Sequence, residues 1–194
     1  MIGSRSKINR ILWLGAAVAL MQSGVLYAMV QQHVSILRDG IDITLQSEPV
    51  DPHDFLRGDY VTLRYTISNI EAGKINGTIP ATDGPADVYV TVKEGDGGVW
   101  TFAGASWQKR EDVPSGEVQL RGRTSSFANA AAYSPLRVTY GIERYYVPEG
   151  QGRVIEAQQQ ERKIEAVVAV SSAGDAQIRA LKDNGTVLYE EPIY

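Results

Sequence analysis

One segment near the N-terminus limits what this chain can fold into more than any other. Residues 11–30 read ILWLGAAVALMQSGVLYAMV and contain no charged side chain. A helix of about twenty residues is about 30 Å long, which matches the hydrocarbon core of a bilayer. The segment therefore predicts one transmembrane helix, and residues 31–39 can extend it until Gly40 ends it.

The charges around this segment predict its orientation. Three basic residues precede it: Arg5, Lys7 and Arg10. Because Lys and Arg mark the cytoplasmic side of a membrane helix, residues 1–10 are expected in the cytoplasm. Residues 40–194 are then expected to form one extracytoplasmic domain, in the periplasm, anchored in the cytoplasmic (inner) membrane.

A cleaved signal peptide is the alternative interpretation of residues 11–30. Its apolar core would be shorter and would end in a small-x-small cleavage site. Leu26-Tyr27-Ala28 places a large residue where a small one is needed, so an uncleaved anchor is favoured.

The composition of the chain excludes several classes of function. It has no cysteine, which excludes disulfides, thiolate metal sites and a cysteine nucleophile. It carries 19 Lys and Arg against 23 Asp and Glu, without a basic patch, which argues against a nucleic-acid partner. Its 19 Gly and 8 Pro suit a β fold that is rich in turns.

The clearest strand signal lies in residues 55–67. Apolar or aromatic residues occupy every second position: Val61, Leu63, Tyr65 and Ile67. This spacing places them on one face of a strand. Gly58 and Asp59 suit the turn before it, since glycine allows a positive φ and aspartate accepts backbone N–H bonds. We predict one continuous strand whose opposite face, with Tyr60 and Arg64, could form a binding surface.

The residues GDYVTLRY, positions 58–65, match completely the motif after which the GDYXXLXY family of bacterial membrane-anchored proteins is named. The chain also resembles this family in PVDP at 49–52 and in YGIERYYVPEGQG at 140–152. The family has no established activity, but its members tend to be found with polytopic membrane proteins, sometimes fused to them. The resemblance implies a domain that binds or supports such a protein.

The predicted site consists of two sets of residues from these segments. The first set comes from the motif: Gly58, Asp59, Tyr60, Leu63, Arg64 and Tyr65. The second set is Tyr140, Gly141, Tyr145, Pro148, Glu149 and Gly150. Glu149 could be a buried carboxylate with a raised pKa, or simply a favourable charge at a helix start.

The remaining pattern predicts a mainly β (α+β) fold with one or two short helices. The expected strands are 41–45, 88–92, 99–103, 117–120, 136–147, 163–170, 176–181 and 186–190. Residues 88–103 and 176–190 are expected to form hairpins, the second across Asn184-Gly185. The expected helical segments are 127–133 and 152–162, and residues 68–85 are expected to form a polar loop.

Part of the chain has an internal similarity. Residues 63–67, LRYTI, resemble residues 136–140, LRVTY. Two β modules related by duplication would explain this, but the intervening lengths differ and chance similarity is the alternative.

The sequence offers little for catalysis, and we assign no catalytic, metal or cofactor site. His53 lies among Asp51 and Asp54 without a further ligand at metal-site spacing. A cell-envelope hydrolase of the serine-lysine, signal-peptidase-like type is the alternative function, with Ser47 and Lys93 as its dyad. Ser106 and Lys109 have the Ser-x-x-Lys spacing of penicillin-binding enzymes but lack the other motifs.

Overall fold

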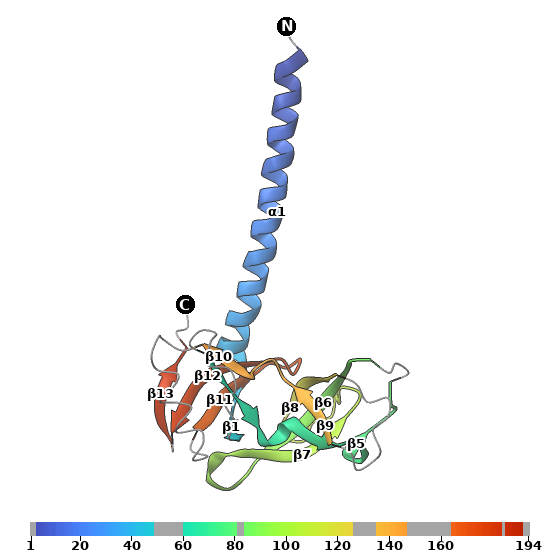
Figure 1. Cartoon of the computed structure of the whole chain (residues 1–194), viewed down its shortest axis with the longest axis vertical. Coiled ribbons are helices and arrows are strands. Elements are labelled where there is room, and N and C mark those ends of the chain that lie inside the picture. Colours follow the sequence, from blue (N-terminus) through green and yellow to red (C-terminus); the bar gives the residue numbers. More distant parts are fainter. Residues whose placement is uncertain are drawn as a thin grey trace. The chain divides into compact units, whose positions relative to one another are not determined.

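The computed structural model describes residues 3–48, 60–80, 84–125, 135–146, 164–183 and 185–191 (Figure 1). The chain divides into two compact units, Met1–Ser35 and Ile36–Tyr194. The second unit consists mainly of strands, and the first belongs to one long helix. The predicted mainly β (α+β) class is therefore confirmed.

Helix α1 (Gly3–Asp39) contains the apolar segment and its predicted extension. It is long and apolar enough to cross a membrane. Its large apolar side chains between Leu12 and Val30 are exposed, as expected of a helix whose apolar surface requires lipid as solvent. The helix ends before Gly40, whose N–H donates to the Ile36 carbonyl over 2.9 Å. A Cβ at position 40 would collide with that carbonyl, so glycine is required there.

The last turn of α1 belongs to the second unit and is held by its strands. Ile36 is buried, and the Arg179 guanidinium donates to the Leu37 carbonyl. The same guanidinium forms an ion pair with Asp42, with 2.9 Å between Nε and Oδ1. A cation near the C-terminal end of a helix is stabilising because the carbonyl groups there carry partial negative charge.

A five-stranded sheet forms one part of the second unit, in the order β13-β12-β11-β1-β3. Its strands are β1 (Ile41–Glu48), β3 (Arg64–Tyr65), β11 (Ile164–Val170), β12 (Ala176–Asp183) and β13 (Thr186–Glu190). Neighbouring strands are antiparallel throughout. Ile43 and Leu45 of β1 are buried, whereas Ile41 at its start is exposed. The predicted hairpin β12–β13 is confirmed.

A six-stranded sheet forms the other part, in the order β4-β9-β8-β6-β7-β5. Its strands are β4 (Asn69–Glu71), β5 (Ile75–Asn76), β6 (Ala86–Glu94), β7 (Trp100–Ser106), β8 (Glu117–Thr124) and β9 (Pro135–Thr139). Only the β5–β7 pair among these described strands is parallel. The predicted hairpin β6–β7 is confirmed.

The prediction of one continuous strand after the Gly58-Asp59 turn, over residues 60–67, is wrong. The chain forms β2 (Tyr60–Thr62), leaves the ladder at Leu63, forms β3 and then turns through the 3-10 helix η1 (Thr66–Ser68). The Leu63 N–H still donates to the Glu143 carbonyl over 2.8 Å, in the register of β2 with β10, and the chain then moves to β1. β2 and β3 consequently pair with different strands.

Two other predicted boundaries are also wrong. The strand expected over residues 136–147 ends at Thr139, and β10 (Arg144–Tyr146) follows a turn in which Gly141 has a φ of 83°. The loop expected over residues 68–85 contains β4, the 3-10 helix η2 (Ala72–Lys74) and β5. Ile70 and Ile75 hold these short strands in place because both side chains are buried in the core. The helices expected at 127–133 and 152–162 lie outside the described residues.

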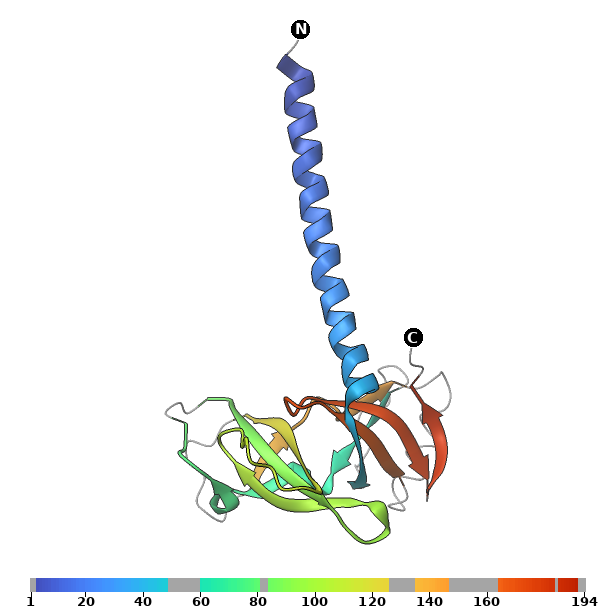
Figure 2. The ribbon, with the colours of Figure 1, turned by 180° about the vertical axis from the view of Figure 1, so that it is seen from behind.

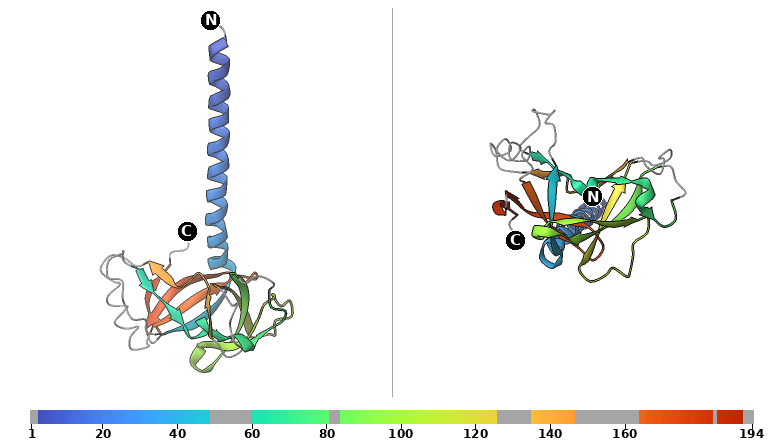
Figure 3. Two further views of the ribbon diagram at one scale, coloured as in Figure 1. Left: turned by 45° about the vertical axis from the view of Figure 1, so that its right-hand side comes forward. Right: turned by 90° about the horizontal axis from the view of Figure 1, so that it is seen from below.

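The two sheets share one core. Figures 2 and 3 show the strands of residues 164–190, in orange and red, on one side of the second unit and the green and yellow strands of residues 86–124 on the other. A single cluster of buried apolar side chains receives residues from both sheets. Leu63 and Tyr65 belong to this cluster, so the apolar face of the motif is buried as its spacing predicted.

The sheets also meet along the turn between β11 and β12. The Arg121 N–H of β8 donates to the Gly174 carbonyl over 2.8 Å, and the Arg121 guanidinium pairs with Asp175. Gly174 has a φ of +92°, and a Cβ there would lie 2.9 Å from the Arg121 nitrogen. The junction therefore requires glycine, because it combines left-handed backbone with close backbone approach.

Candidate functional site

The two predicted sets of site residues meet in one two-stranded ribbon. β2 and β10 pair antiparallel, with Tyr60 opposite Tyr146, Val61 opposite Tyr145 and Thr62 opposite Arg144. We call these six residues the motif ribbon. Two segments that are far apart in the sequence are thus direct neighbours.

One side of the motif ribbon belongs to the core. Tyr145 is buried, and its ring meets the edge of the Tyr189 ring with 5.5 Å between the centroids. Its hydroxyl donates to Glu191 over 3.2 Å. Burial and the Glu191 carboxylate both raise the pKa of Tyr145, so its hydroxyl stays protonated at neutral pH.

The other side of the motif ribbon faces outward. Thr62 and Arg144 are exposed there, and 73% of Tyr146 is accessible to solvent. Arg64, the next motif residue on β3, is partly exposed and lies opposite Glu48 of β1. We call Thr62, Arg64, Arg144 and Tyr146 the outer face. Its arginine and tyrosine side chains are of the types most often found at the energetic centre of protein interfaces.

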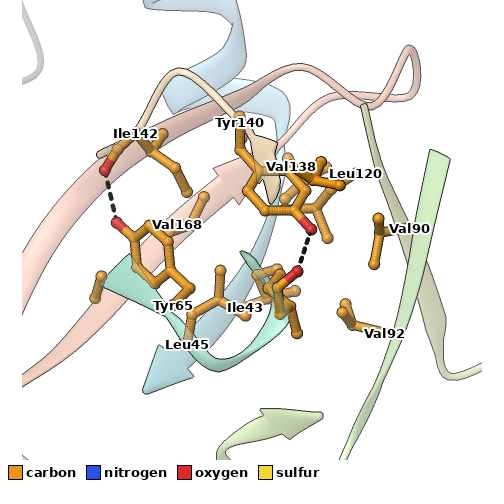
Figure 4. Packing of buried hydrophobic residues seen from close by; sticks show 14 of the residues in the cluster. Ile43, Leu45, Tyr65, Val90, Val92, Leu120, Val138, Tyr140, Ile142 and Val168 are labelled. Carbon is orange, nitrogen blue, oxygen red and sulfur yellow. Dashed lines mark hydrogen bonds between the residues drawn. The ribbon is translucent and has the colours of Figure 1, made fainter. Parts of the chain in front are cut away.

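Tyr65 and Tyr140 each donate a hydrogen bond to the backbone of the turn that follows the other tyrosine, and we call this pair the tyrosine lock. The Tyr65 hydroxyl donates to the Ile142 carbonyl over 2.7 Å, and the Tyr140 hydroxyl donates to the Ile67 carbonyl over 2.6 Å (Figure 4). Each hydroxyl therefore reaches the carbonyl two residues after the other tyrosine. Both rings are buried between the sheets.

The backbone around each tyrosine repeats the same pattern. The Tyr65 N–H donates to the Ser68 hydroxyl over 3.2 Å, and the Tyr140 N–H donates to the Glu143 carboxylate over 2.5 Å. In both cases the acceptor is the side chain three residues later. Residues 65–68 and 140–143 thus share a hydrogen-bond pattern. This similarity is separate from the sequence similarity of 63–67 with 136–140.

The tyrosine lock is built for structure rather than for proton transfer. Burial, with a smaller contribution from the Glu143 carboxylate, raises the pKa of Tyr65 and of Tyr140 above the ordinary value of 10. Both hydroxyls therefore remain protonated donors at neutral pH. Their carbonyl partners would be left buried without a donor if the hydroxyls were removed.

This arrangement predicts a measurable coupling between the two tyrosines. Tyr65→Phe and Tyr140→Phe should each lower the free energy of unfolding by about 1–3 kcal/mol, because each leaves a buried carbonyl unsatisfied. Both bonds fix the same two turns, so the double variant should lose less than the sum, with a coupling of about 0.5 kcal/mol or more. Denaturant unfolding of the four proteins measures this, and strict additivity would contradict the lock.

The structure does not assemble the serine-lysine pairs. Ser47 is buried on β1, whereas Lys93 is exposed on β6 of the other sheet and has no hydrogen-bond partner among the described residues. The Ser106 hydroxyl donates to the Gln108 carbonyl over 2.6 Å. Lys109 instead donates to the Ser172 carbonyl over 2.8 Å, so neither Lys93 nor Lys109 is bonded to its predicted serine in the described part of the chain.

The described part of the chain also lacks a site for a metal ion. No group of three His, Asp or Glu residues is placed there to hold one. His33 is exposed on α1, with its Nδ1 2.9 Å from the Met29 carbonyl oxygen. His53 lies outside the described residues, as do the predicted site residues Gly58, Asp59, Pro148, Glu149 and Gly150.

Sequence reasoning missed the residues that complete the site. Glu143 holds the turn of the second segment by accepting from the Tyr140 and Gly141 N–H groups. Arg144 and Tyr146 supply half of the outer face. One signal for the turns was present: Tyr-x-Ile followed by a polar residue occurs at both 65–68 and 140–143.

The protein is thus a two-sheet β domain that follows a helix long and apolar enough to cross a membrane. A family model described as GDYXXLXY protein matches residues 22–181, which includes both strands of the motif ribbon, and the chain belongs to that family. Neither a search of the curated proteins nor a search of the solved structures found a match.

Proposed function

We propose that this protein is a membrane-anchored extracytoplasmic domain that binds or supports a polytopic membrane protein through the outer face. The pairing within the motif ribbon carries this proposal. It joins the two family segments and directs Arg144 and Tyr146 outward, while Leu63 and Tyr65 pack in the core. The motif therefore serves stability through one face, and the solvent-exposed side chains of the other face are the proposed contact.

The chemistry of the outer face favours a protein partner. Arg64 and Arg144 can bind carboxylates in bidentate geometry, and Tyr146 adds a large, rigid and amphipathic contact surface. A partner loop with acidic and aromatic residues would complement this face. The anchor confines the domain to the membrane, where the effective concentration of a membrane neighbour exceeds that of soluble proteins.

The proposal places residues 1–10 in the cytoplasm and the domain outside the inner membrane. Membrane fractions should retain the protein after a carbonate wash, since the apolar part of α1 binds lipid far more tightly than surface charges do. Protease added to intact spheroplasts should digest the chain after Gly40. A soluble protein that begins near Met29 would show that the segment is a cleaved signal peptide.

Site-specific photocrosslinking tests the proposed contact. A benzophenone amino acid at Thr62 lies on the outer face, and the same group at Ala103, an exposed residue of β7, is the matched control. Crosslinking in native membranes should join Thr62 to an integral membrane protein and leave Ala103 without that product. Equal capture from both positions, or capture of soluble proteins only, would contradict the proposal.

A further inference from the structure

Gln22 lies near the middle of the apolar part of α1. It carries the one side-chain amide of residues 11–30, a range that contains no charged residue. Its side chain is exposed and makes no hydrogen bond among the described residues. If α1 crosses the membrane, as the proposed function requires, this amide lies at the depth of the hydrocarbon core.

An amide in hydrocarbon requires a hydrogen-bond partner. It has two N–H donors and a carbonyl acceptor, and lipid tails offer neither acceptors nor donors to them. Ser23 differs, because a serine hydroxyl can donate to the carbonyl four residues earlier in its own helix. Gln side chains in membrane helices instead form hydrogen bonds to a second helix. Gln22 therefore marks the face of α1 on which another helix packs.

The residues on this face have the spacing of a helix–helix interface. Positions that are alternately three and four residues apart form a stripe along one side of a helix. Gly15 and Ala19 lie on the stripe two turns and one turn before Gln22, and small side chains let two backbones approach closely. A Cβ at Gly15 would meet nothing within 4 Å. We call this stripe the heptad face, and its residues are Leu12, Gly15, Ala19, Gln22, Leu26 and Met29.

We propose that two copies of this chain associate in the membrane through the heptad face, with their Gln22 amides hydrogen-bonded to each other. The amide is self-complementary, because the NH₂ group of one can donate to the carbonyl of the other. Copies of one chain share one orientation in the membrane, so a two-fold axis places both Gln22 side chains at the same depth. A helix of another protein would need its own polar residue at that depth. The pairing rests on the anchor of the proposed function and not on the outer face.

Disulfide crosslinking in native membranes tests this pairing, because the chain has no cysteine of its own. In the full-length protein, Ala19→Cys places a thiol on the heptad face. Ala17→Cys places one on the opposite side of the same helix and is the matched control. Under copper-phenanthroline and air, Ala19→Cys should form a disulfide-linked dimer of this chain, and Ala17→Cys should form little.

The role of the amide is tested in the Ala19→Cys protein at low expression, where association is incomplete. Gln22→Leu should weaken association about threefold or more, because it removes the interhelical hydrogen bonds. Leucine keeps the helix apolar, so this loss cannot come from poorer insertion. Gln22→Asn retains an amide and should retain the dimer. Met21→Leu, which points away from the heptad face, should change nothing.

Four results would overturn the pairing. They are equal crosslinking from positions 17 and 19, no crosslinking from position 19, an unchanged dimer in Gln22→Leu, and a crosslink from position 19 to a different protein. The last result would assign the heptad face to a helix of that protein. Any of these results, with the chain still retained in carbonate-washed membranes and Thr62 still capturing its partner, would keep the proposed function. Loss of the chain from washed membranes would refute both the anchor and the pairing.

Discussion

Leu63→Ala should lower the free energy of unfolding by about 2–5 kcal/mol, because it opens a cavity in a core that both sheets share. The Leu63 side chain is 1% exposed and lies in the central apolar cluster. Alanine retains the N–H that donates to the Glu143 carbonyl, so the loss reports side-chain packing alone. Denaturant unfolding of the full-length protein, followed by the fluorescence of buried Trp107, measures it.

Thr66→Ala provides the control for that experiment. Thr66 lies three residues later in the same segment and is exposed, so its truncation should change stability by no more than about 0.5 kcal/mol. If Leu63→Ala unfolds like the wild type, the motif leucine has no structural role. Burial of its side chain would then contribute far less to the free energy of unfolding than is expected in a densely packed core.

Gly122→Val should destabilise the protein by about 3 kcal/mol or more, because it overpacks the space beside the tyrosine lock. A Cβ at position 122 would collide with Val138 and would lie 3.0 Å from the ring of Tyr140. Gly122 is on β8, next to β9, so the side chain cannot move outward without breaking the ladder. Thermal unfolding should show a clear decrease in Tm.

Gly104 is the matched control, since it is also a strand glycine. A Cβ there would meet nothing within 4 Å, so Gly104→Ala should change stability by no more than about 1 kcal/mol in either direction. Similar losses in both variants would point to a general cost of replacing strand glycines. That result would contradict the interpretation that Gly122 is needed to leave room for the Tyr140 ring.

Periodicity predicted which side chains are buried better than it predicted where strands end. Leu63, Tyr65 and Ile67 are all buried, as the alternation in residues 61–67 predicts. Burial follows from the local alternation of side chains, which the sequence contains. The break at Leu63 lies where the chain changes its pairing partner from β10, which is far away in the sequence, to β1. No local pattern contains that information.

The site was predictable in its segments and not in its geometry. The sequence selected Tyr65 and Tyr140 separately, but the tyrosine lock depends on how the turns at 65–68 and 140–143 meet in the fold. The outer face is likewise a product of long-range antiparallel pairing between β2 and β10. Propensities describe short stretches of chain, and such pairing is decided by packing across the whole domain.

The most direct test of the account is partner capture from Thr62 in variants of the outer face. Arg64→Ala and Tyr146→Ala should each reduce capture of the integral membrane protein about tenfold or more, as truncation of interface hot spots does. Each variant should unfold at the same temperature as the wild type, since both side chains are accessible to solvent. Unchanged capture in both variants, together with selective labelling of Ser47 or Ser106 by a serine-reactive probe, would contradict the account and favour a hydrolase.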